Sequence, residues 1–253
     1  YSDPTVGVLS IQDLHFGKEG NDDIVEEFRE AVSTLVVKTY HSHKVDKMIY
    51  VIGGDLLNMD TFSGLTTKGT PVDNDYRAQD AYNMAFDSLY WSINFIKQFC
   101  DTLHIVYLPG NHDRLSSYHM AHALSKCFNG STNIIFDVEY AERKVITYGS
   151  NFFAFEHGDV TKKMTALVYA TEFPEQWGTT LYRTCYTGHF HSKKVTEFVT
   201  DNEVHGFAIK HLPSLCKSDY WHYHNKFIGA KRQAIMEIHH GTKGKISEFI
   251  YTV

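Results

Sequence analysis

The sequence predicts an α/β fold in which two mixed β-sheets pack face to face with helices outside. Up to about residue 127, apolar runs typical of buried strands alternate with helical periodicity, and after it strand-like runs follow one another. Five of the predicted strands also end at or near a cluster of Asp, His or Asn side chains. Because α/β folds usually bind ligands at strand ends, these clusters predict a functional site.

The first half of the chain predicts three strands and three helices. A strand at 6–12 is followed by a helix from Asn21 to about Tyr40, with Asn21 as its candidate N-cap. A strand at 48–52 runs into Gly53-Gly54-Asp55, and a Gly- and Thr-rich loop at 60–73 precedes a long helix from about 75 to 99. A strand at 102–107 is ended by Pro109-Gly110, and a short helix follows at about 116–127.

The second half predicts mainly strands. They are expected at 133–138, 144–149, 151–156 and 182–188, with helical residues at about 161–172. From Lys193 to Val253 the pattern alternates like antiparallel strands, with a polar and aromatic interruption at 217–227. No repeat or low-complexity tract is visible. The length alone fits one large α/β domain or two small ones, and we expect a single domain over residues 1–253.

Composition excludes some classes of function. The chain of 253 residues is 43% hydrophobic and has no apolar run of membrane-spanning length, so an ordered protein outside the membrane is expected. A formal charge of −6 argues against coating of nucleic acid by bulk charge, although two divalent cations would bring it to −2. The four widely spaced cysteines predict reduced thiols and a cytoplasmic location. Because the chain begins with Tyr1, we expect a trimmed or processed product.

The five polar clusters together predict a metal centre. They are Asp13-Leu14-His15, Gly53-Gly54-Asp55, Gly110-Asn111-His112-Asp113, His157-Gly158-Asp159 and Gly188-His189-Phe190-His191. Any one of them could be an ordinary turn. In an extended chain, residues two apart face the same way, so Asp13 with His15, and His189 with His191, can reach one metal cluster. Oxygen and nitrogen ligands without thiolate favour Mn, Fe or Zn, and so many ligands favour two ions.

In this order the motifs resemble the calcineurin-like metallophosphoesterase superfamily over about residues 6–191. The resemblance implies a four-layer αββα fold around two divalent metals, with Mn²⁺ favoured and Fe, Zn, Mg or Ni as alternatives. It implies that Asp13, His15 and His191 hold one ion, that Asn111, His157 and His189 hold the other, and that Asp55 bridges them. His112 resembles the family's catalytic histidine.

The resemblance can be narrowed to one branch. The chain lacks the Asp-Arg-Gly segment of phosphoprotein phosphatases and is more similar to SbcD-like repair nucleases. It is closer still to phage and prophage proteins labelled DNA repair exonuclease, which share TTKGTP at 66–71 and the pattern of PSLCKSDYWH at 213–222. This implies hydrolysis of phosphodiesters, foremost in DNA, in the cytoplasm of a bacterial or phage-infected cell. The alternative is a phosphatase or diesterase of nucleotides or other small esters, and a catalytically dead scaffold is disfavoured because all seven ligands are present.

Several further side chains are open to two interpretations. Asn58, Lys217 and Trp221 are candidate substrate contacts, although the segment around Trp221 equally fits an exposed hairpin and some repair nucleases have a histidine at the position of Asn58. Lys68 could meet a phosphate, with a solvated lysine as the default. His239 and His240 are expected at the surface. Nucleic acid or a nucleotide is the expected partner, and a homodimer is left open.

Overall fold

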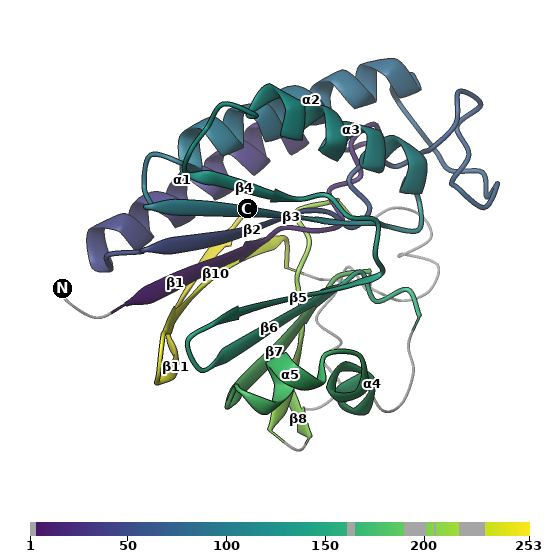
Figure 1. The fold of residues 1–253 in the computed structure, drawn as a ribbon. Helices are drawn as coiled ribbons and strands as arrows, with labels where there is room; N and C mark the ends of the chain where they lie inside the picture. The colour runs from purple at the N-terminus through teal and green to yellow at the C-terminus, as the bar shows by residue number, and fades with distance from the viewer. Residues whose placement is uncertain (1–3, 161–164, 190–200, 205, 218–230) are drawn as a thin grey trace.

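The computed structural model describes residues 4–160, 165–189, 201–204, 206–217 and 231–253. Two mixed sheets lie face to face, with helices on both outer sides (Figure 1). The predicted α/β class and its four-layer αββα arrangement are therefore confirmed.

The first sheet has the strand order β11-β10-β1-β2-β3-β4. Its strands are β1 (Thr5–Ser10), β2 (Lys47–Gly53), β3 (Thr102–Leu108), β4 (Ile134–Asp137), β10 (Gln233–His240) and β11 (Gly244–Thr252). Strands β1 to β4 run parallel, whereas β10 pairs antiparallel with β1 and with β11. The parallel strands bring the loops after β1, β2 and β3 to one edge of the sheet.

The second sheet has the order β5-β6-β7-β9-β8. Its strands are β5 (Arg143–Tyr148), β6 (Asn151–Glu156), β7 (Tyr182–Thr187), β8 (Asp201–Val204) and β9 (Phe207–His211). Strands β6, β7 and β9 are parallel, and β5 and β8 are antiparallel to their neighbours.

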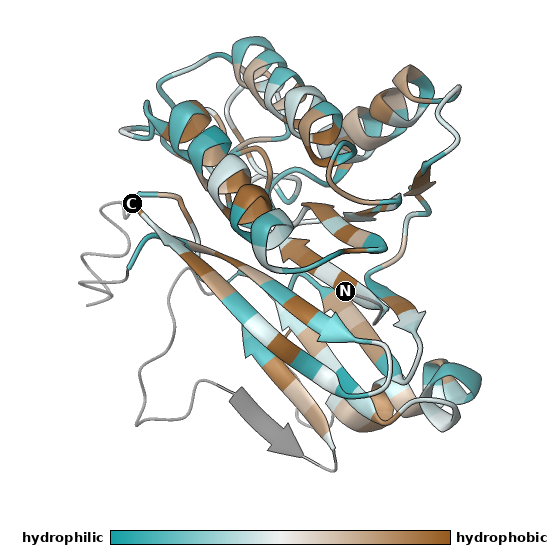
Figure 2. Ribbon diagram, turned by 90° about the vertical axis from the view of Figure 1, so that its left-hand side faces the viewer, coloured by the Kyte–Doolittle hydropathy of each residue, from teal (hydrophilic) through white to brown (hydrophobic). Residues whose placement is uncertain are grey.

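Three clusters of buried side chains fill the spaces between the layers. Helices α1 (Ile24–Ser42), α2 (Ala78–Ile96) and α3 (Arg114–Cys127) cover the first sheet over the largest cluster, which includes Phe28 and Tyr50. A second cluster between the sheets includes Val8 and Phe155. A third lies between the second sheet and α4 (Thr165–Glu172) and α5 (Pro174–Gly178). Figure 2 shows hydrophobic and hydrophilic residues mixed along the helices, as expected when one face packs on a sheet.

Four local expectations are corrected by the structure. Helix α1 begins at Ile24 with Asp23 at its N-cap, because the Asn21 amide donates to Leu14 O instead. Helix α5 was not predicted, since five residues are too few to show a period. Strand β9 pairs parallel with β7, although antiparallel strands were expected beyond Lys193.

The fourth correction concerns His239 and His240, which are 2% and 7% exposed rather than at the surface. Strand β10 has a neighbour on either side, and its inner face is covered by the second sheet. All four cysteines are free, as expected, with Cys185 and Cys216 buried and Cys127 exposed. Among the described residues, no helix combines the length and apolar character needed to cross a membrane.

Candidate metal centre

The loops after five strands bring the predicted ligands together. Asp13 and His15 follow β1, Asp55 follows β2, Asn111 follows β3, His157 follows β6 and His189 follows β7. Within the described part of the chain, two groups of side chains place one ligand atom each within 4.8 Å of the others: His15, Asp55 and His112, and Asp55, His157 and His189. Asp55 belongs to both groups, as a bridging ligand must. His191 lies outside the described residues.

The ligand loops adopt unusual backbone conformations. Asp13, His15, Asp55 and His189 have φ angles of 57°, 46°, 59° and 68°, and they are the only described residues other than glycine with positive φ. Left-handed backbone costs free energy for a residue with a Cβ and concentrates at functional sites. Here the conformation is held by the neighbouring loops, because Asp13 N donates to Gly54 O at 2.8 Å and His15 N donates to Asp55 O at 3.1 Å.

Two glycines permit this close approach. A Cβ at Gly110 would lie 2.1 Å from the backbone nitrogen of Asp55, and a Cβ at Gly188 would lie 2.6 Å from Asp13 Oδ2. Both distances are far inside van der Waals contact. The glycine in each motif is therefore required to bring one loop against another.

The polar contacts join the two groups through Asp55. Its Oδ1 accepts a hydrogen bond from His112 N at 2.7 Å, and its Oδ2 lies 3.0 Å from His157 Nε2. His157 Nε2 also lies 3.0 Å from Asn111 Oδ1. Asp13 Oδ2 accepts from His189 N at 2.8 Å, which ties the first loop to the loop after β7. Five of the seven predicted ligands take part in these contacts, and His15 joins them through its backbone hydrogen bond to Asp55 O.

Burial and the attraction between opposite charges compete in this network. It raises the pKa of Asp13 to about 7, although the charge of His157 opposes the rise. Burial also favours a raised pKa for Asp55, but the positive charge of His157 holds that pKa well below its usual range. Burial favours a lowered pKa for His157, but the charge and hydrogen bond of Asp55, together with the charges of Asp13 and Asp159, raise this pKa to about 9. Two buried carboxylates therefore share the positive charge of one histidine.

The donor set fits divalent cations. Asp55 Oδ2 is shielded from solvent and lies 3.0 Å from His157 Nε2, with which it forms an ion pair. Carboxylate, imidazole and amide ligands without thiolate suit Mn, Fe or Zn.

The backbone carbonyl of Asn58, a residue predicted to contact substrate, orients the ring of His112. Its Nδ1 lies 2.9 Å from Asn58 O, and because a carbonyl only accepts, Nδ1 carries the proton. Its Nε2 is left facing the centre, 4.0 Å from Asp55 Oδ2. From this position Nε2 can either donate a proton to a bound molecule or act as a ligand, and it belongs to the first ligand group.

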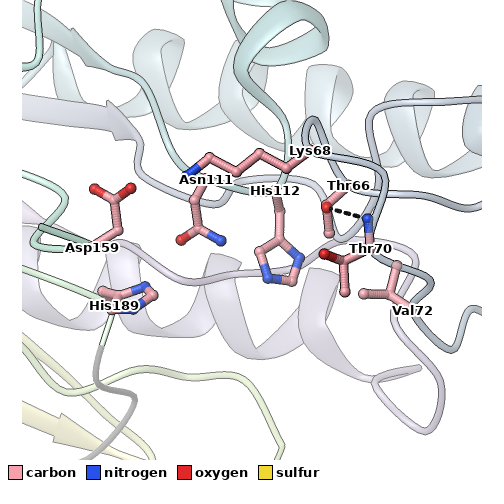
Figure 3. A pocket seen from close by; sticks show the side chains of 8 residues that line it. All are labelled: Thr66, Lys68, Thr70, Val72, Asn111, His112, Asp159 and His189. Carbon is pink, nitrogen blue, oxygen red and sulfur yellow. Dashed lines mark hydrogen bonds between the residues drawn. The ribbon is translucent and has the colours of Figure 1, made fainter.

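A cavity of about 250 Å³ opens beside the centre (Figure 3). It is lined by Thr66, Lys68, Thr70, Val72, Asn111, His112, Asp159 and His189. Three of these residues come from the candidate centre, and four come from the Gly- and Thr-rich loop. The loop therefore forms the wall opposite the ligands.

The predicted substrate contacts lie elsewhere, as far as the structure describes them. The Asn58 side chain is 4% exposed and donates to Asp73 O at 3.0 Å and to Asn74 Oδ1 at 2.8 Å. Lys217 Nζ pairs with Asp23 at 2.7 Å. Neither residue lines the cavity, so their contact with substrate stays a prediction, and Trp221 lies outside the described residues.

Sequence reasoning gave no role to three residues that support the centre. Ser214 Oγ donates to Asp13 O at 2.6 Å, and the buried Lys18 donates to Lys217 O at 3.0 Å, so the segment 214–217 is attached to the first ligand loop. Asp60 accepts from Ser116 N at 2.8 Å and from Thr67 Oγ1 at 2.7 Å. These contacts join segments far apart in the sequence, which local patterns do not reveal.

Comparison with known proteins adds little to this picture. No model of a protein family matches the chain, and no curated protein matches it. Among solved structures, the chain is similar to the crystal structure of Chaetomium thermophilum Vps29, at 12% identity over 98% of each chain, with a TM-score of 0.40. A match this weak carries no conclusion about the activity of this chain.

Proposed function

We propose that this chain is a dinuclear-metal phosphoesterase of the calcineurin-like type that hydrolyses phosphodiesters, foremost in DNA. The observation that carries the proposal is the pair of ligand groups that share Asp55 beside a cavity lined by His112. The motif order supports the phosphoesterase class, and the absent Asp-Arg-Gly segment supports diesters. The free cysteines fit a reducing compartment such as the cytoplasm.

Seven side chains would hold the two cations. Asp13 and His15, with His191 from outside the described residues, would hold one cation; Asn111, His157 and His189 would hold the other, and Asp55 would touch both. Two divalent cations, with Mn²⁺ favoured, would neutralise phosphate oxygens and make water a stronger nucleophile at neutral pH.

His112 would act on the leaving group. Its Nδ1–H donates to Asn58 O, which orients the ring with Nε2 toward the centre. A proton on Nε2 would pass to the departing oxygen, a step for which a positioned donor contributes about 10²–10⁴-fold.

A small-ester phosphatase is the second candidate. The formal charge of −6 and a cavity of about 250 Å³ favour a substrate no larger than a nucleotide. Both candidates use the same centre and differ in the ester they accept.

A screen of substrates with Mn²⁺-loaded protein separates the candidates. We expect bis(p-nitrophenyl) phosphate to be cleaved faster than p-nitrophenyl phosphate, and single-stranded oligonucleotides to be cut, with metal-stripped protein as the control. Hydrolysis of mononucleotides without cleavage of any oligonucleotide would support the small-ester candidate. Absence of all hydrolysis with Mn²⁺, Zn²⁺, Fe²⁺, Ni²⁺ or Mg²⁺ would refute both.

A further inference from the structure

The loop at 66–70 is held by internal hydrogen bonds and is attached to the loop of His112. Within it, Thr66 N donates to Thr70 O at 2.9 Å, and Gly69 N donates to Thr66 O at 2.8 Å. Gly69 has a φ of 83°, which closes the turn at little cost. Thr67 N donates to His112 O at 3.0 Å, and Thr67 Oγ1 donates to Asp60 at 2.7 Å. The loop is therefore fixed relative to the candidate catalytic histidine.

Lys68 extends from the tip of this loop over the cavity. Figure 3 shows its side chain passing above His112 toward Asn111, with the ammonium group on the side of the candidate ligands. Lys68 is an exposed residue that also lines the cavity. Thr66 and Thr70 flank it with hydroxyl groups, so this wall is polar apart from Val72.

The charges around the cavity leave Lys68 without a partner among the described residues. The other charged side chain in the lining, Asp159, is 12% exposed and lies 3.6 Å from Arg114 Nη2. Asp13 and Asp55 are buried in the centre, where bound cations would neutralise them. The ammonium group of Lys68 is thus available to an anion that enters the cavity.

We propose that Lys68 is a substrate-positioning residue that contacts a phosphate oxygen from the wall opposite the metal ligands. The inference rests on the proposed function, because it takes the substrate to be a phosphate ester held at the centre. A point charge on a flexible stem accepts a phosphate in many orientations. Lys68 therefore favours phosphate binding without selecting a base.

The test compares Lys68→Met with Lys68→Arg in the full chain loaded with Mn²⁺. For Lys68→Met we expect KM to rise about tenfold for bis(p-nitrophenyl) phosphate and for an oligonucleotide, the effect of losing one charge-assisted hydrogen bond, with little change in kcat. Lys68→Arg should restore most of the affinity. For the oligonucleotide, the slope of log(kcat/KM) against log[salt] should become shallower by about 0.7 in Lys68→Met, because one fewer counterion is displaced.

Lys38→Met is the matched control, because Lys38 is an exposed lysine on α1 that does not line the cavity. It should leave KM and the salt slope unchanged. Wild-type KM and salt slope in an active Lys68→Met variant would overturn the inference and leave the proposed function standing.

Binding of inorganic phosphate to the Mn²⁺-loaded protein, followed by calorimetry, separates the two hypotheses. If the wild type hydrolyses no ester but binds phosphate about tenfold more tightly than Lys68→Met, the contact of Lys68 with phosphate stands and the proposed hydrolysis fails. If the wild type neither hydrolyses esters nor binds phosphate, both are wrong.

Discussion

The unusual backbone of the ligands decides which substitutions can test them. Asp55 lies at φ 59°, a conformation that asparagine tolerates better than most residues with a side chain. Asp55→Asn therefore removes the negative charge and keeps the shape of the loop. At His112 no positive φ is involved, so alanine is a safe replacement there.

We expect Asp55→Asn and His112→Ala to fail in different ways. Asp55→Asn should bind less than the wild-type amount of Mn²⁺, because Asp55 belongs to both ligand groups. His112→Ala should keep its metal but lose about 10²–10⁴-fold in kcat on an ester with a poor leaving group, and less on an activated aryl ester. Metal analysis of the loaded proteins, together with kcat on both esters, checks the prediction.

The contrary results are informative because His112 also belongs to one ligand group. Loss of one metal ion in His112→Ala would identify the residue as a ligand. Equal losses on the two esters would instead indicate that His112 orients the phosphate. Full metal content and activity in Asp55→Asn would exclude the bridging role.

Motifs in the sequence predicted which candidate metal ligands lie close together, but not which contacts the neighbouring side chains make. Asp13, His15, Asp55, Asn111, His157 and His189 come together because each follows a strand whose end is fixed by the sheets. By contrast, Asn58 and Lys217 are engaged by Asn74 and Asp23, contacts set by loop conformation. The same limit hid the burial of His239, which depends on the opposite sheet.

At the scale of elements, Asp60 connects the wall of the cavity to helix α3. Its carboxylate accepts from the backbone nitrogens of Leu115 and Ser116 in the first turn of the helix, while Asp113 at the N-cap position forms no side-chain capping bond there. It also accepts from Thr67 in the loop. Asp60 thus accepts hydrogen bonds that an N-cap residue of α3 would accept, although Asp60 lies in a distant segment of the chain.

We expect Asp60→Ala to lower the free energy of unfolding by about 1–2 kcal/mol at pH 7, the usual cost of a lost cap. Burial favours a raised pKa for Asp60, but hydrogen bonds from Ser116 and Thr67 lower it below its ordinary value. Because the folded pKa is the lower one, the stabilisation is complete above the unfolded value of about 4 and is lost as the pH falls through the folded value.

Urea unfolding at several pH values between 7 and 3 measures this difference. The gap between wild type and Asp60→Ala should narrow below about pH 4. Asp87→Ala, at an exposed position on α2, is the control and should cost little at any pH. A gap that is constant over the whole range would show that the charge of Asp60 is not what stabilises the helix.

The positions of the strands along the chain were easier to predict than the pairing between strands. Strands β1, β2 and β3 of the first sheet appear as apolar runs at nearly the observed positions, since burial on both faces leaves a continuous signal. The parallel pairing of β9 with β7 was missed, because pairing joins residues that are distant in sequence.

At the scale of the whole molecule, a buried ionic cluster joins the two sheets. Glu237 on β10 is 2% exposed and is contacted by Lys210 and Tyr186 from the second sheet, and by His239 at 3.2 Å. Burial favours a raised pKa for Glu237, but the hydrogen bond from His239 and the charge of Lys210 hold it below its ordinary range. The negative charge of Glu237 and the positive charge of Lys210 therefore stabilise each other.

We expect Glu237→Gln to destabilise the fold by about 1–3 kcal/mol, because the buried Lys210 loses one of its two carboxylate partners and keeps only Glu248. The double variant with Lys210→Met should recover part of this loss, which a double-mutant cycle of urea unfolding measures. Lys245→Met, whose side chain is 42% exposed, should cost less than about 1 kcal/mol. Additive effects of Glu237→Gln and Lys210→Met would contradict the coupling.

The pairing of β10 with β1 has a consequence for when the candidate centre can form during synthesis. Thr5 pairs with His240, so one edge of β1 stays open on the ribosome until almost all of the described chain has emerged. Contacts between residues so distant in sequence form late and slow the folding of a chain. Asp13 and His15, which follow β1, also wait for Ser214 to bond to the first ligand loop. We therefore expect the candidate centre to form late in folding, after β10 has paired with β1.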